Sequence, residues 1–188
     1  THSTLRAGYN QGSQGGIVEV LRGESVNIRA IERDDQEALN AWWNEAEIWI
    51  EQGSRRHLSS MDETGAWYEI LVDKIESNEG RTYAIEDTDG NLLGTIGYGP
   101  WDTRDRNCAI TLYIGDPAER GRGYGTAACR LLVDYLFSDL GLQKAWLQVV
   151  STNERAIACY RKVGFVQEGV LRQHRFARGQ FHDYVFMA

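Results

Sequence analysis

The sequence lacks several features that would assign it to other classes of protein. No apolar run in its 188 residues approaches the length of a membrane-spanning helix, and the first residues do not join a charged start to an apolar core. The three cysteines, Cys108, Cys129 and Cys159, are widely spaced and do not follow the spacing of metal ligands. We therefore expect a cytoplasmic protein with reduced thiols, no membrane association and no bound metal.

Positive charge is scarce as well. The chain has 20 Lys and Arg against 27 Asp and Glu, which gives a formal net charge of -7. This balance argues against a general affinity for nucleic acid, so we expect no nucleic-acid partner. An acidic surface suits a cationic substrate, although solubility alone favours the same charge.

The chain divides into a short N-terminal tail and one domain. Residues 1–16 hold four glycines among polar residues without apolar periodicity, so we interpret them as a flexible tail or a cloning remnant outside the fold. Residues 17–188 are expected to form a single domain, since their length suffices for one full core. Their periodicity predicts the order β-α-α-β-β-β-α-β-α-β-β, which is typical of an α/β domain layered around a mixed sheet.

The predicted elements follow from strand-like alternation, helical stripes and turn residues. Strands are predicted over 26–31, 81–86, 91–98, 107–114, 144–150, 165–171 and 181–187. Helices are predicted from residue 34, from 61 or 62 to 76, over 127–137, and from 153 to 164. The second helix is expected to turn Trp67, Ile70 and Leu71 inward.

The most informative segment is Arg120-Gly121-Arg122-Gly123-Tyr124-Gly125-Thr126, which joins a predicted strand to a predicted helix. Its glycines allow backbone N–H groups to converge, and the helix adds the positive end of its dipole. The segment thus predicts a pyrophosphate site. It is not a P-loop, which needs a lysine after the last glycine, and its spacing and position fit a dinucleotide fingerprint poorly. A glycine-rich turn that binds nothing remains the alternative.

A second motif lies 28 residues after Gly125. The segment from Asn153 to Phe165 reads Asn-x-x-Ala-x-x-x-Tyr-x-x-x-Gly-Phe. Together with Arg120-x-x-Gly123-x-Gly125, it resembles the two signatures of the GNAT superfamily of N-acetyltransferases. The resemblance covers about residues 26–188. The closing segments 168–172 and 179–183 are similar to the branch that contains spermidine acetyltransferases and acetyltransferases of ribosomal-protein N-termini.

This resemblance implies a fold and a co-substrate. The implied fold is a GNAT-like mixed, mostly antiparallel sheet with splayed central strands, flanked by helices on both faces. The implied co-substrate is acetyl-CoA, held by the glycine loop, by the strand before it and by the second motif. The residues implied to contact acetyl-CoA are Leu112, Tyr113, Ile114, Arg120, Gly121, Arg122, Gly123, Tyr124, Gly125, Thr126, Asn153, Arg155 and Tyr160.

The resemblance also implies catalytic roles. Tyr160 matches the tyrosine that protonates the departing CoA thiolate, although helical spacing alone would make it a buried packing residue. Many relatives carry a glutamate base on the strand before the glycine loop, where this chain has Ile110. We therefore expect the base to be Glu51 or its neighbours Glu45 and Glu47, or a relay of waters. The alternative interpretation makes each of these carboxylates a solvated charge at a helix end.

The implied reaction is direct transfer of an acetyl group from acetyl-CoA to a primary amine. A polyamine-like small cation, a protein N-terminus and an aminoglycoside all remain open as acceptors. One of the adjacent residues Trp42 and Trp43 is expected in the core, and the other, with Trp49, beside the acceptor. The alternative function is a non-catalytic acyl-CoA-binding sensor or interaction domain on the same fold. A homodimer is compatible with the sequence, but no residue establishes it.

Overall fold

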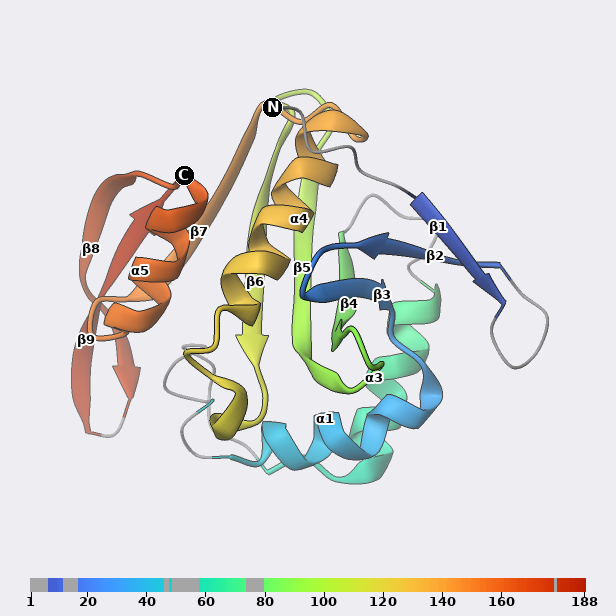
Figure 1. Cartoon of the computed structure of the whole chain (residues 1–188). Helices are drawn as coiled ribbons and strands as arrows, with labels where there is room; N and C mark the ends of the chain where they lie inside the picture. The colour runs from blue at the N-terminus through green and yellow to red at the C-terminus, as the bar shows by residue number, and fades with distance from the viewer. Residues whose placement is uncertain (1–6, 12–16, 46–47, 49–57, 74–79, 178) are drawn as a thin grey trace.

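The computed structural model describes residues 7–11, 17–45, 48, 58–73, 80–177 and 179–188. Its centre is a nine-stranded sheet in the order β1-β2-β3-β4-β5-β6-β7-β9-β8 (Figure 1). Neighbouring strands pair antiparallel, except that β6 and β7 run parallel. The strands are β1 (Ala7–Gln11), β2 (Ile17–Arg22), β3 (Val26–Ala30), β4 (Arg81–Asp87), β5 (Leu92–Asp102), β6 (Asn107–Ile114), β7 (Lys144–Val150), β8 (Gln167–Ala177) and β9 (Gln180–Met187).

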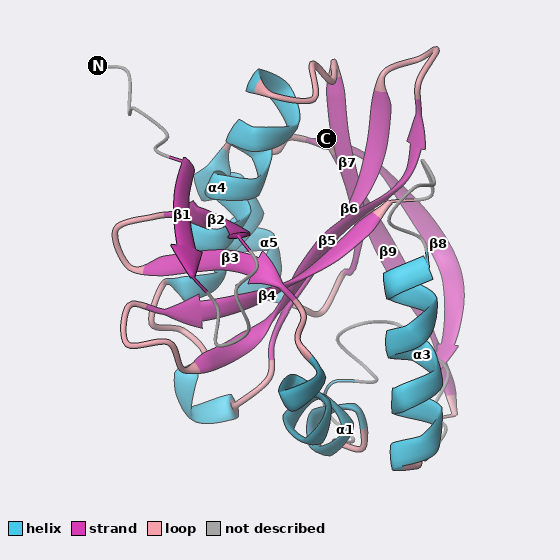
Figure 2. Cartoon of the chain, turned by 90° about the vertical axis from the view of Figure 1, so that its right-hand side faces the viewer, coloured by secondary structure: helices cyan, strands magenta, loops and turns pink. Residues whose placement is uncertain are grey.

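Helices cover both faces of this sheet (Figure 2). The main core lies under α4, whose Leu132 and Leu136 are fully buried against Ile28 and Ile96. A second, smaller core lies on the other face, where Leu39 packs with Ala84. The helices of the described residues are α1 (Gln36–Trp43), α3 (Met61–Asp73), α4 (Tyr124–Ser138) and α5 (Glu154–Val163), with short 3-10 turns η1 (Arg33–Asp35) and η3 (Pro117–Glu119).

The sheet opens between its two parallel strands. β6 and β7 pair only over Asn107–Ala109 and Lys144–Trp146. Beyond these residues β6 continues to Ile114 and β7 to Val150 without pairing to each other. Because the two strands separate in mid-sheet, they leave a wedge-shaped opening in front of the glycine loop. The predicted splayed strands and the predicted α/β fold are therefore confirmed.

Several sequence-based expectations differ from the structure. Residues 17–22, for which no strand was predicted, form β2. Ala7–Gln11, predicted as part of a tail, forms an edge strand paired with β2. Backbone hydrogen bonds to a neighbouring strand order this segment, although its composition carries no apolar pattern. On α3, Ile70 is 51% exposed, although helical spacing predicted it inward. The face that α3 buries is decided by the neighbouring α1, which periodicity alone does not locate.

Candidate functional site

A cavity of about 320 Å³ fills the opening between β6 and β7. Residues of four segments line it: the second half of β6, the glycine loop with the first turn of α4, the later part of β7, and one side of α5. Eleven of the thirteen residues predicted to contact acetyl-CoA are among them; these are Leu112, Tyr113, Ile114, Arg120, Gly121, Gly123, Gly125, Thr126, Asn153, Arg155 and Tyr160. The fold thus gathers the two sequence motifs around one space.

The glycine loop needs glycine at two positions. Gly121 has a φ of 78° and Gly123 a φ of 95°, in the left-handed region that disfavours other residues. Gly123 is also the N-cap of α4, and it provides no side chain to cap the helix. The first N–H groups of α4 are therefore left to a ligand or solvent, together with the positive end of the helix dipole.

The two loop arginines have different surroundings. Arg120 donates from Nε to the carbonyl of Ile114 at 3.0 Å and from Nη2 to the carbonyl of Gly115 at 2.9 Å. Its guanidinium therefore ties the loop to the end of β6. Arg122 lies outside the cavity lining, forms an ion pair with Glu119 at 2.6 Å and stacks over the Tyr124 ring. Arg122 and Tyr124 are thus the two predicted contacts that do not line the cavity.

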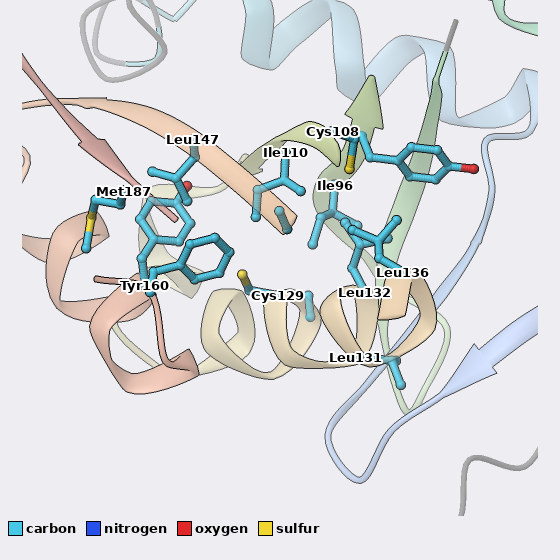
Figure 3. Close-up of a cluster of buried hydrophobic side chains, with 14 of the residues drawn as sticks. Ile96, Cys108, Ile110, Cys129, Leu131, Leu132, Leu136, Leu147, Tyr160 and Met187 are labelled. Carbon is cyan, nitrogen blue, oxygen red and sulfur yellow. The ribbon is translucent and has the colours of Figure 1, made fainter. Parts of the chain in front are cut away.

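Tyr160 lines the cavity and also belongs to the main core. α5 begins after Asn153, whose side chain accepts a hydrogen bond from the N–H of Ala156, and this register turns Tyr160 toward the core. Tyr160 is 7% exposed, and its ring lies near Leu147 and Cys129 (Figure 3). Burial, and then the neighbouring cysteines, raise the pKa of its hydroxyl above the ordinary value. The phenol is therefore protonated at neutral pH.

Sequence reasoning missed several lining residues. Cys159 accepts a hydrogen bond from Thr126, and Lys162 lies one turn beyond Cys159 and two turns beyond Arg155 on α5. Their spacing from Arg155, four and seven residues, is the signal that could have found them. Thr111 of β6 and Gln148 of β7 also line the cavity. They could not be found from the sequence, because only the separation of the strands exposes them.

The predicted base is not placed by the structure. Glu51 and Glu47 lie outside the described residues, as does Trp49, whereas Glu45 is exposed just after α1.

Both tryptophans of α1 contact Tyr113: Trp42 packs edge-on against its ring, and Trp43 donates from Nε1 to its hydroxyl at 2.9 Å. Burial raises the pKa of Tyr113 to about 12.

The described residues contain no group of three or more His, Cys, Asp and Glu that could hold a metal ion. Among the helices they form, none is long and apolar enough to cross a membrane.

The fold and the cavity between separated parallel strands define an acetyltransferase of the GNAT class. Residues 25–166 match the acetyltransferase (GNAT) domain, and the chain belongs to this family. It is an acetyl-CoA-dependent N-acetyltransferase that acts on an amine. The alternative of a non-catalytic acyl-CoA sensor finds no support in the comparisons.

Among known proteins, the chain is similar to the spermidine N(1)-acetyltransferase of Escherichia coli (strain K12). The two are 31% identical over 167 residues, which cover 87% of this chain and 84% of that protein. The chain is also 35% identical over 98 residues to a putative ribosomal N-acetyltransferase of Bacillus subtilis (strain 168), with 52% and 53% of the two chains covered.

A solved structure shows the same fold. The crystal structure of spermidine N-acetyltransferase from Vibrio cholerae in complex with CoA and spermine matches with a TM-score of 0.79 at 27% identity. The match covers 88% of this chain and 95% of that chain.

Proposed function

We propose that this enzyme acetylates a primary amine of a small, polyamine-like cation. The observation that carries the proposal is the cavity between β6 and β7, which joins the glycine loop to Tyr160 in a chain with a net charge of -7. The relatives from Escherichia coli and Vibrio cholerae are named for spermidine, and the latter was crystallised with spermine. An acidic protein attracts such cations over distance.

We propose that acetyl-CoA binds in this cavity, and the residues present fit it. Uncapped N–H groups at the start of α4 and the two left-handed glycines suit a pyrophosphate. Arg120, Arg155 and Lys162 add positive charge to the lining. Bound there, acetyl-CoA supplies the thioester that is attacked. Of the thirteen predicted contacts, Arg122 and Tyr124 do not line the cavity. We propose that they bind acetyl-CoA mainly through their main-chain N–H groups.

Tyr160 is the proposed general acid. It gives its proton to the sulfur as the carbon–sulfur bond breaks and the new bond to the amine nitrogen forms. A main-chain N–H of β6 polarises the carbonyl oxygen, a role typically worth a few kcal/mol. Glu51 remains the proposed acceptor of the amine's proton, directly or through water, and solvent returns a proton to Tyr160.

Four further properties are proposed. The net charge of -7 supports an enzyme without a nucleic-acid partner, and the widely spaced cysteines support a cytoplasmic location. We also propose a homodimer, which light scattering of the purified protein would test. Residues 17–188 are proposed as the domain, with β1 added at its edge.

The test is an assay of CoA release with spermidine, spermine, an aminoglycoside and a peptide with a free N-terminus. We expect kcat/KM for a polyamine to exceed that for the peptide and the aminoglycoside at least tenfold. A higher kcat/KM for the peptide than for the polyamines would show instead that the enzyme acetylates protein N-termini. Turnover of none of these amines would contradict the proposal.

A further inference from the structure

The cavity reaches both faces of the sheet. On β6, Cys108 and Ile110 belong to the core under α4, and a Cβ on Gly125 of α4 would lie 3.7 Å from Leu112. Successive residues of a strand point to opposite faces, so Thr111 points to the face that carries α1. Tyr113, two residues further, contacts Trp42 on that face. Thr111 nevertheless lines the same cavity as Tyr160.

β7 repeats this arrangement. Leu147 and Val149 belong to the core, so Gln148 between them points to the face of Thr111. The last paired residues are Ala109 and Trp146, and Thr111 and Gln148 each lie two residues beyond them. The two side chains are therefore the first pair on this face after the strands separate. Both are exposed, and both line the cavity.

Two side-chain contacts of Trp146 hold the closed end of the opening. Trp146 donates from Nε1 to Oδ1 of Asn107 at 3.2 Å, and its ring stacks on Phe186 at 5.3 Å between centroids. Thr111 and Gln148 lie two residues beyond Ala109 and Trp146 on their strands, and Gln148 is paired with Phe186 between β7 and β9. Within the described residues neither of their side chains forms a hydrogen bond to the protein. A hydroxyl and a primary amide at such a place offer two acceptors and two kinds of donor to a ligand.

We propose that Thr111 and Gln148 bind the acceptor from the face opposite α4 and α5, and hold its attacking nitrogen toward the acyl group. The amide oxygen of Gln148 accepts an N–H of the amine, and the Thr111 hydroxyl bonds a neighbouring polar group of the acceptor. The inference rests on the proposed place of acetyl-CoA in this cavity. Two uncharged side chains would then select the acceptor. Because neither carries a negative charge, they orient the amine without stabilising its protonated, ammonium form.

The test compares KM values for the two substrates in Gln148→Leu and Thr111→Val. Loss of one neutral hydrogen bond raises the acceptor KM by about tenfold, while the acetyl-CoA KM changes by less than about twofold. Thr111→Ser restores the acceptor KM, because it keeps the hydroxyl. Gln143→Leu is the matched control: Gln143 is exposed before β7 and lies outside the cavity lining.

Spermidine is the first acceptor used. If the wild-type enzyme does not acetylate spermidine but does acetylate the peptide or the aminoglycoside, the polyamine proposal fails, and the same variants are measured with that acceptor. Unchanged acceptor KM values in both variants would overturn the inference, as would an equal rise in the acetyl-CoA KM. Turnover of no amine would overturn both proposals.

Discussion

The indole ring of Trp42 fills the space beside the main chain of Gly115, where a Cβ would fall 2.0 Å from its Cδ2 atom. This contact joins α1 to the chain just after β6. The carbonyl of Gly115 also accepts a hydrogen bond from Arg120 of the glycine loop. Gly115 therefore contacts both α1, through Trp42, and the glycine loop that lines the cavity, through Arg120.

Gly115→Ala is expected to destabilise the protein by about 1–3 kcal/mol, because the added methyl group overlaps the ring of Trp42. Urea unfolding measures this free energy. In the background Trp42→Leu, the same substitution should cost clearly less, since the overlapping ring is gone. Equal costs in the two backgrounds would show that the ring is not the cause.

Tyr160→Phe is expected to lower kcat by roughly 100-fold through loss of the general acid. The matched control is Tyr98→Phe, which removes a hydroxyl from a buried tyrosine of β5 outside the cavity lining and should retain kcat. Because burial raises the pKa of Tyr160, its neutral form persists as pH rises through the ordinary tyrosine value of about 10. The kcat of the wild type should therefore show no loss from deprotonation of Tyr160 between pH 7 and about pH 10. Equal kcat values for wild type and Tyr160→Phe would exclude this role.

Gly123→Ala should cost about 1–2 kcal/mol in the free energy of unfolding, because alanine disfavours a φ of 95°. It should also raise the KM for acetyl-CoA without changing the acceptor KM, since the loop amides move. Gly169→Ala, on β8 with open space around its Cα, is the control and should stay within about 0.5 kcal/mol of wild type. An unchanged acetyl-CoA KM in Gly123→Ala would argue against the pyrophosphate site.

Asp35→Asn should destabilise the protein by about 2–3 kcal/mol. Asp35 accepts two hydrogen bonds from Arg29, at 2.7 and 2.9 Å, and the same guanidinium donates to Glu86 of β4. The site is largely buried, and an asparagine would keep only one acceptor oxygen for the two N–H groups of Arg29 and would lose the negative charge, although Glu86 still pairs with Arg29. Thermal unfolding checks the loss.

The control for this pair is Arg33→Gln, which removes the exposed pair Arg33–Glu69 and should cost less than about 1 kcal/mol. A loss of similar size in both variants would contradict the importance of burial for the Arg29–Asp35 pair.

Local signals predicted most of the secondary structure near the site. The strands 107–114 and 144–150 were predicted with their observed bounds, because alternating or continuous apolar residues and adjacent turn residues mark them. The helix after the glycine loop begins at Tyr124, three residues before the predicted start, because the glycines themselves enter its first turn. The N-terminal strands β1 and β2 were both missed. For β1 the reason is that an edge strand can be held by backbone pairing without an apolar pattern.

The sequence by itself determined the two motifs, the family and the position of Tyr160 on its helix, because each depends on residues close together along the chain. Only the tertiary structure decided where β6 and β7 stop pairing, which face Thr111 and Gln148 share, and that Arg122 is paired with Glu119 outside the cavity. Such features depend on strand register and on contacts between distant segments, and no local pattern of residues specifies them.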